Sequence, residues 1–234
     1  MRTARFFVPA EWIASSAEAF CIPAGPLHKQ IVAVLRMKAG DQISLLTNDN
    51  TELACRITEI TRSAVMGVIA GSIVGKPVAP KITVCAAVTK RDSFEWMLEK
   101  CTELGATEFI PILTDRTIKR TKENSPRLHL ILKEASEQSG RFTLPNLVDP
   151  MSLGAAVGHT DGMVRIAMHE TGGSMLPKIH KTSEIALFIG PEGGFTDEEL
   201  ATLKDAHAHI VTFGDLVFRA ETAAMVGVTL LRFT

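Results

Sequence analysis

The chain of 234 residues lacks the features that mark membrane and secreted proteins. No stretch approaches the roughly eighteen consecutive apolar residues that a membrane-spanning helix needs. The first residues, MRTARFFVPAEW, lack the long apolar core of a secretory signal. The net charge of -1 creates no overall attraction to nucleic acid, so such a partner would have to be bound by a local basic patch. We expect a cytoplasmic globular protein that does not interact with membranes.

Motifs built on cysteine and histidine are scarce as well. Four widely spaced cysteines form no C-x-x-C pair of the kind found in zinc sites and redox couples, and we expect all of them to be reduced and structural: Cys21, Cys55, Cys85 and Cys101. The H-x-H pair His207 and His209 is interpreted as a surface or packing feature. No metal site is predicted.

The pattern of the chain changes near residues 75–80. Before this point, the short apolar stretches QISLL, ACRITEI and AVMGVIAG predict a small, mostly β domain over residues 1–74, with one helical piece around HKQIVAVLRM. GKPVAP is read as a short linker. Beyond it, apolar runs alternate with amphipathic helices at 92–104, 126–139, 197–208 and the end of the chain. This alternation predicts an α/β domain with a mainly parallel sheet over residues 75–234.

Helix boundaries carry clear local signals. Gly105 and Gly140 follow two of the predicted helices at positions where a left-handed residue ends a helix. Ser125 is a candidate N-cap, followed by Pro126 in the first turn. Thr196 and Glu199 form the T-x-x-E pattern of a capping box, so a helix is predicted to begin near Asp197.

The segment IGPEGGFTDEEL, residues 189–200, places a glycine cluster between a predicted strand and a helix. Ligands of open α/β sheets bind at the carboxyl ends of strands, where glycines allow close approach of the main chain. The cluster matches neither the phosphate loop of nucleotide triphosphatases nor the dinucleotide fingerprint. Glu192 and the acidic residues that follow argue against a triphosphate, whereas a carboxylate and free main-chain groups suit a ligand with a positive charge, an adenine and a ribose. The alternative is a tight turn without a ligand.

A second loop repeats this plan. IVTFGDLVFRAETAAMVGVTLL runs from a strand through a glycine turn into an Ala-rich helix, with Arg219, Glu221 and Thr222 at the junction. The two loops could line one cleft. Alternatively, Glu221 and Thr222 only begin the last helix and Arg219 pairs locally.

These loops carry a family resemblance. IGPEGGFTDEEL and FGDLVFRAETA, preceded by KRDSFEWMLEKCTELGATEFIPILTDR and EASEQSGR, resemble the bacterial 16S ribosomal RNA uridine-N3 methyltransferases of the SPOUT superfamily over nearly the whole chain. The stretches ARFFV and VLRMKAGD are similar to the RNA-binding domain of that family. The resemblance implies a PUA-like N-terminal β-barrel, a trefoil-knotted C-terminal α/β domain and a homodimer. It also implies the cofactor S-adenosylmethionine and, as substrate, 16S ribosomal RNA of the small ribosomal subunit.

The resemblance also assigns site residues. The cofactor loops comprise Gly190, Pro191, Glu192, Gly193, Gly194, Phe213, Gly214, Leu216, Val217, Phe218, Thr222 and Ala223, and His169 is expected to border the cleft. Methyl transfer from a sulfonium donor requires a uracil nitrogen that has lost its N3 proton. Arg219 is the candidate stabiliser of the uracil oxygens, and Glu221 the candidate positioning group or base.

Candidate RNA contacts are spread over both halves of the chain. They are Arg2, Arg5, Arg36, Lys38, Arg116, Lys119, Arg120, Glu137, Gln138 and Arg141. Ordinary solvated cations and a polar helix end are the alternative interpretation.

Three residues depart from the family pattern. Leu216, Ala33 and Ser93 stand where the family often has basic residues, which puts some RNA or charge contacts in doubt. An RNA-binding ribosome-assembly factor with weak or absent catalysis is therefore the alternative function. A hydrolase is a weaker third hypothesis, because no nucleophile and base pair stands out.

Overall fold

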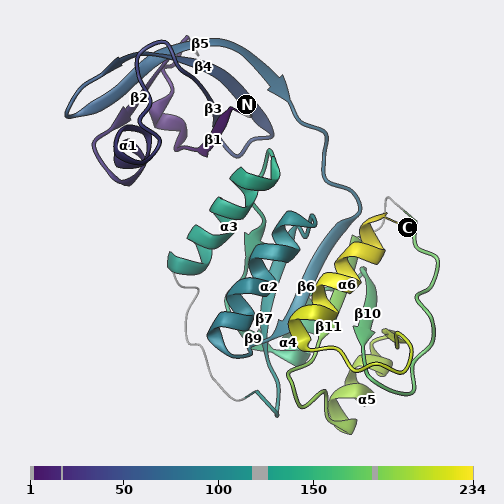
Figure 1. Cartoon of the computed structure of the whole chain (residues 1–234). Helices are drawn as coiled ribbons and strands as arrows, with labels where there is room; N and C mark the ends of the chain where they lie inside the picture. Colours follow the sequence, from purple (N-terminus) through teal and green to yellow (C-terminus); the bar gives the residue numbers. More distant parts are fainter. Residues whose placement is uncertain (1–2, 17, 118–125, 181–183, 234) are drawn as a thin grey trace. The chain divides into compact units, whose positions relative to one another are not determined.

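The computed structural model describes residues 3–16, 18–117, 126–180 and 184–233. The chain forms two compact units (Figure 1). The first unit consists of Met1–Pro77 and the later segment Ser136–Leu144, and the second consists of Val78–Ala135 and Pro145–Thr234. Within the described residues, no helix is both long enough and apolar enough to cross a membrane.

The first unit is built on a five-stranded, curled sheet (Figure 1). Its elements are β1 (Ala4–Phe7), η1 (Ala10–Trp12), β2 (Ala19–Pro23), α1 (Pro26–Lys29), η2 (Gln30–Val34), β3 (Gln42–Leu46), β4 (Thr51–Ile60) and β5 (Ala64–Val74). The strand order is β1-β3-β4-β5-β2, in which only the β1–β3 pair is parallel. Leu53, Cys55 and Ile57 alternate with exposed residues along β4, so one face of that strand packs on the core.

The helical piece predicted around HKQIVAVLRM is shorter and less regular than an α-helix. Four α-helical residues lead into a π-helical turn, and Arg36 then adopts the left-handed conformation with φ of 53°. Ile31 is fully buried, whereas Val34 and Leu35 are exposed.

The second unit is an α/β domain around a parallel sheet. Its strands are β6 (Lys81–Ala87), β7 (Glu108–Leu113), β8 (Asn146–Leu147), β9 (Met151–Ser152), β10 (Val164–Met168), β11 (Glu184–Ile189) and β12 (His209–Val211). The order is β12-β10-β11-β6-β7-β8, with β9 also paired to β7, and all of these pairings are parallel. β6 and β11 are buried along nearly their whole length, which explains their continuous apolar sequences.

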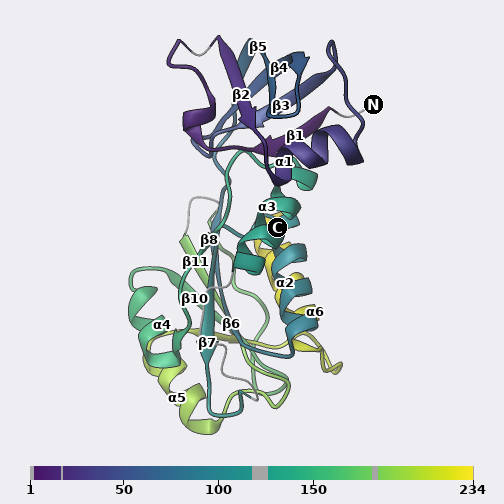
Figure 2. The same ribbon diagram turned by 90° about the vertical axis from the view of Figure 1, so that its left-hand side faces the viewer.

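Helices cover both faces of this sheet. They are α2 (Arg91–Glu103), α3 (Pro126–Ser139), α4 (Leu153–His159), α5 (Asp197–Asp205) and α6 (Ala220–Phe233). Figure 2 shows α2 and α6 on one face and α4 and α5 on the other. The two resulting cores are separate: α2 and α6 pack through residues such as Leu98 and Val228, and α4 and α5 through Ala156 and Leu203.

The local helix signals are confirmed. Gly105 and Gly140 have φ of 102° and 85° at the ends of α2 and α3. The Thr196 side chain accepts a hydrogen bond from the Glu199 amide while the Glu199 side chain accepts one from the Thr196 amide, so the capping box is present at the start of α5. Pro126 begins α3, and the predicted N-cap Ser125 lies outside the described residues.

Short elements were missed. α4 contains Gly154 and Gly158 within seven residues, which lowers its helical propensity, and the Ser152 N-cap together with packing on the sheet stabilises it. β8 and β9 have two residues each, too few for a periodic pattern.

Candidate functional site

The candidate site lies at the carboxyl ends of three neighbouring strands of the sheet. β12, β10 and β11 lie side by side and parallel, so their carboxyl ends meet at the same edge. The loop after β11 is the first glycine loop, Gly190–Thr196, and the loop after β12 is the second glycine loop, Thr212–Arg219. The end of β10 supplies Met168 and the residues that follow it between the two loops.

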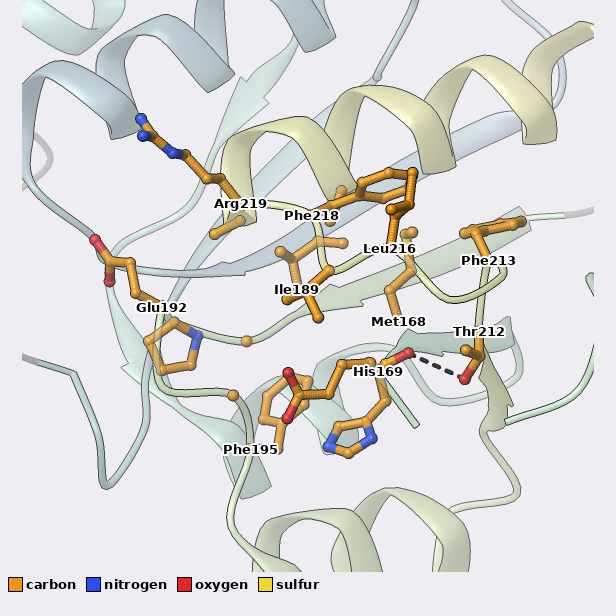
Figure 3. A pocket seen from close by; sticks show the side chains of 17 residues that line it. Met168, His169, Ile189, Glu192, Phe195, Thr212, Phe213, Leu216, Phe218 and Arg219 are labelled. Atoms are coloured by element: carbon orange, nitrogen blue, oxygen red, sulfur yellow. Dashed lines mark hydrogen bonds between the residues drawn. The ribbon is translucent and has the colours of Figure 1, made fainter. Parts of the chain in front are cut away.

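These segments enclose a cavity of about 250 Å³ (Figure 3). Its lining consists of Met168, His169, Glu170, Ile189, Gly190, Pro191, Glu192, Gly194, Phe195, Thr212, Phe213, Leu216, Val217, Phe218, Arg219, Ala220 and Ala223. Figure 3 shows Arg219 and Glu192 at one end of the cavity and Phe213 at the other. The lining is therefore mostly apolar side chains and main chain, with carboxylates at Glu170 and Glu192.

The conformation of the first glycine loop explains why glycine stands at two of its positions. The Gly194 amide donates a hydrogen bond to the Pro191 carbonyl at 2.8 Å, which closes a tight turn, and Gly194 has φ of 70°. At Gly190 an added Cβ would lie 3.2 Å from the Phe195 amide nitrogen. Phe195 is buried in the core below. Gly190 and Gly194 thus meet a steric and a conformational requirement of a loop whose backbone faces a cavity.

The second glycine loop is tied to the end of β10. The His169 amide donates to the Val211 carbonyl at 3.0 Å, and the Thr212 hydroxyl donates to the His169 carbonyl at 3.0 Å (Figure 3). Gly214 has φ of 68° and turns the chain. These bonds fix the base of the loop, whereas Leu216 and Val217 near its tip are largely exposed.

Most of the predicted cofactor residues converge on this cavity. His169, Gly190, Pro191, Glu192, Gly194, Phe213, Leu216, Val217, Phe218 and Ala223 all line it. Gly193, Gly214 and Thr222 belong to the same segments but do not line the cavity. The two glycine loops therefore form one site, as the spacing suggested.

The two predicted catalytic residues point in different directions. Arg219 lines the cavity and its side chain is exposed. Glu221 does not line the cavity and is only 8% exposed. Its carboxylate Oε1 lies 3.5 Å from the Ser93 hydroxyl in the first turn of α2.

Several predicted RNA contacts are engaged inside the first unit. Arg5 pairs with Glu52 at 3.1 Å and donates to the Arg141 carbonyl at 2.9 Å. The Glu137 carboxylate accepts a hydrogen bond from the Phe7 amide at 2.8 Å, and Arg141 is buried. These placements favour a packing role for Arg5, Glu137 and Arg141 over a contact with RNA. Their sequence patterns gave no sign of it, because each partner lies far away in the chain.

The remaining RNA candidates are exposed or lie outside the described residues. Arg36, Lys38 and Gln138 are exposed on the first unit. Arg116 is exposed on the second unit, where its guanidinium donates a hydrogen bond to the Gly193 carbonyl. The candidates outside the described residues are Arg2, Lys119 and Arg120.

Sequence reasoning missed part of the lining. Met168, Glu170, Ile189, Phe195, Thr212 and Ala220 were not assigned to the site. Ile189 is the last residue of β11, and Met168 that of β10. The rule that ligands bind at the carboxyl ends of strands could have found both once the three strands were known to be neighbours.

Comparisons with known proteins agree with this architecture. Residues 76–232 match the RNA methyltransferase domain family, and residues 31–69 match the RNA methyltransferase PUA domain. Ribosomal RNA small subunit methyltransferase E of Bacillus subtilis is 28% identical over 233 residues, covering 93% of this chain and 91% of the relative. The protein of the same name from Rickettsia conorii is 27% identical over 207 residues, covering 86% and 84%.

Solved structures extend the similarity to three dimensions. The crystal structure of ribosomal RNA small subunit methyltransferase E from Neisseria gonorrhoeae, bound to S-adenosylmethionine, is 25% identical with a TM-score of 0.89 over 98% of this chain and 97% of that chain. A protein from Legionella pneumophila in complex with the same cofactor is 28% identical with a TM-score of 0.85 over 99% and 97%. The predicted fold class is confirmed for the α/β domain with a mainly parallel sheet and for the PUA-like β domain as a separate unit. Since the domain match alone covers more than half of its length, the chain belongs to the RNA methyltransferase family.

Proposed function

We propose that this chain transfers a methyl group from S-adenosylmethionine to N3 of a uridine in 16S ribosomal RNA. The observation that carries the proposal is the cavity that the two glycine loops build at the carboxyl ends of β10, β11 and β12. Relatives that share this fold over almost their whole length are named small-subunit ribosomal RNA methyltransferases, and two similar structures hold S-adenosylmethionine. The cytoplasm, where ribosomal RNA is modified, is the proposed location.

The lining residues fit this cofactor chemically. S-adenosylmethionine carries a sulfonium and an ammonium group beside an adenine, so it favours carboxylates, apolar surface and free main-chain groups. Glu170 and Glu192 provide the carboxylates, and Met168, Ile189 and Phe213 the apolar surface. The charged side chains of the lining are Glu170, Glu192 and Arg219, so carboxylates outnumber guanidinium groups, which suits a cofactor without phosphate. When bound, the cofactor supplies an electrophilic methyl group.

The residues of the chain have to hold the base and favour loss of its N3 proton to water. Deprotonation leaves negative charge on the uracil oxygens, and the role proposed for the exposed guanidinium of Arg219, which lines the cavity, is to stabilise it. Glu221 is proposed as a positioning residue, because it contacts Ser93 and lies at the first turn of α6 next to Arg219. Since N3 lies on the pairing edge of the base, the target uridine has to be unpaired or flipped out.

RNA binding is proposed for the first unit. Arg36 and Lys38 lie in the segment that matches the PUA domain, and both are exposed. We propose residues 1–74 as the RNA-binding domain and residues 75–234 as the methyltransferase domain.

The functional form is proposed to be a homodimer. The second unit exposes large apolar side chains at Met175 (87%), Leu216 (77%) and Phe233 (71%). Met175 also lines a groove of about 850 Å³, together with residues including Leu176, Ile179, Phe213 and Leu231. Apolar surface of this kind is a typical protein interface, and a second copy of the chain is its proposed occupant.

Two measurements test the proposal. Calorimetry should detect binding of S-adenosylmethionine to the purified protein, and its absence would refute the function. Mass spectrometry of 16S ribosomal RNA from cells with and without the gene should show one N3-methyluridine that disappears with the gene. If the cofactor binds and every methyluridine persists, the assembly-factor hypothesis replaces the enzyme.

A further inference from the structure

We propose that Asp115, Arg116 and Glu199 form a clasp that positions the first glycine loop for cofactor binding. None of the three lines the cavity, so they act through the loop. The identity of the bound cofactor rests on the proposed function. The clasp itself rests on contacts within the second unit.

Glu199 holds the end of the loop. Glu199 is buried, with 7% of the residue exposed, and its carboxylate accepts two backbone hydrogen bonds, from the Thr196 amide at 2.9 Å to Oε2 and from the Asp115 amide at 2.9 Å to Oε1. The first bond belongs to the capping box of α5, whereas the second reaches the segment that follows β7. Hydrogen bonds to an ionised, buried acceptor are stronger than those between neutral groups. One side chain thus connects the loop end to a segment 84 residues earlier.

Arg116 holds the middle of the loop. Its guanidinium donates to the Gly193 carbonyl, inside the turn that the Pro191–Gly194 hydrogen bond closes. Its aliphatic stem covers the same residue, because an added Cβ at Gly193 would lie 3.2 Å from Arg116 Cδ. Among the glycines of this loop, only at Gly193 would an added Cβ contact a side chain of the clasp. This contact accounts for a glycine that does not line the cavity.

The clasp crosses a strand. β6 lies between β11 and β7, so the first glycine loop reaches over the end of β6 to meet the segment after β7. A loop with three glycines in five residues has many conformations when unrestrained. Restricting it before the cofactor arrives lowers the entropic cost of binding. The clasp therefore contributes to affinity without contacting the cofactor.

Hydrogen exchange of the cofactor-free protein tests the clasp directly. R116A should speed amide exchange in the peptide covering residues 190–196 and leave the sheet unchanged. E199Q should do the same, because a glutamine presents an NH2 group to one of the two amides that now donate to Glu199. The matched control is R127A, since Arg127 is also exposed but bonds Glu95 between α3 and α2. Unchanged exchange of residues 190–196 in both R116A and E199Q would overturn the proposal.

Calorimetry tests the consequence for binding. R116A should raise the Kd for S-adenosylmethionine about tenfold, which is the value of one hydrogen bond from a charged group. Its melting temperature should fall by no more than a few degrees, because Arg116 is exposed and one hydrogen bond is removed. R116K should bind more tightly than R116A and less tightly than the wild type, and the control R127A should keep the wild-type Kd. An R116A Kd equal to that of the wild type would contradict the clasp. If the wild-type protein binds no cofactor, the proposed function is contradicted, and the clasp is then tested by hydrogen exchange alone.

A double-mutant cycle supplies the last check. G193V should displace the Arg116 side chain and raise the Kd with the fold retained. If both substitutions break one contact, the Kd of the G193V/R116A double variant should be no higher than that of the weaker-binding single variant. Fully additive effects would show that Gly193 and Arg116 act separately and would overturn their pairing.

Discussion

The carboxylate of Glu221 lies 3.5 Å from the hydroxyl of Ser93, and this contact joins the first turns of α6 and α2. Arg219, two residues before Glu221, lines the cavity instead. The side chains therefore suit different tasks. Glu221 supports the helix that borders the cavity, and Arg219 faces the cavity itself.

Substitutions should separate the two roles. R219A is expected to lower kcat by at least about 100-fold, the usual cost of removing one donor that stabilises developing charge, with no change in melting temperature. E221Q should lower kcat by less than about tenfold and leave the Kd for S-adenosylmethionine unchanged. Steady-state methylation of an RNA substrate and thermal melting provide the measurements. A loss of 100-fold or more in E221Q would identify Glu221 as the base.

A side chain at Gly194 should strain the backbone of the first glycine loop. The φ of 70° at Gly194 costs an alanine about 1 kcal/mol, so G194A should lower the free energy of unfolding by that amount and weaken cofactor binding. Gly158 is the control, because it lies in α4 with nothing within 4 Å of an added Cβ. G158A should stabilise the protein slightly. Urea denaturation of both variants checks the prediction, which fails if G194A is as stable as the wild type.

Arg36 and Lys38 should contribute to RNA affinity through phosphates. The double variant R36A/K38A is expected to weaken RNA binding equally for different sequences and to reduce the slope of log affinity against log salt by about two. Filter binding at several salt concentrations measures this slope. K204A, which removes an exposed cation from α5, serves as control. An unchanged slope in R36A/K38A would exclude these residues from the RNA interface.

One cysteine should react quickly with a thiol reagent in the native protein. Cys21 is exposed, whereas Cys55, Cys85 and Cys101 are buried, and all four are free. Burial raises the pKa of the Cys55 thiol to about 11 and also raises the pKa values of Cys85 and Cys101. Because the thiolate is the reactive form, these three should react only on unfolding. C21S should abolish the fast phase of a colorimetric thiol titration, and a remaining fast phase would contradict the assignment.

Glu95 should make stability depend on acid pH. Hydrogen bonds from Arg127 and, to a smaller extent, Arg91 hold its pKa at about 2, below the ordinary value of 4.5. A depressed carboxylate pKa stabilises the folded state above pH 4.5, and this contribution is lost as the pH falls toward 2. Both arginines are largely exposed, so water screens the pair, and E95Q should cost only about 1 kcal/mol at pH 7.

Urea denaturation at pH 7, 4 and 2.5 measures this dependence. The difference between E95Q and the wild type should shrink at the lowest pH. A difference that stays constant over this range would exclude the ion pair as its cause.

Local signals were sufficient for most of the regular structure. Gly105 after α2, the Thr196–Glu199 pair before α5 and the unbroken apolar sequence of β11 each depend on residues within a few positions of one another. The two glycine loops belong to this class, and their place after strands predicted a shared cleft. The expectation of a knot came from the family resemblance alone, because knots are too rare to be inferred from patterning.

The amino-acid sequence by itself thus determined most of the longer elements, several of their ends and the two glycine loops. The tertiary structure decided which side chains serve those loops and which do not. Glu199 meets Asp115 across 84 positions, Glu137 meets Phe7 across 130, and Glu221 meets Ser93 across 128. The direction of a polar side chain is set by the donor or acceptor that packing brings within hydrogen-bonding distance, and no pattern of neighbouring residues encodes such a partner.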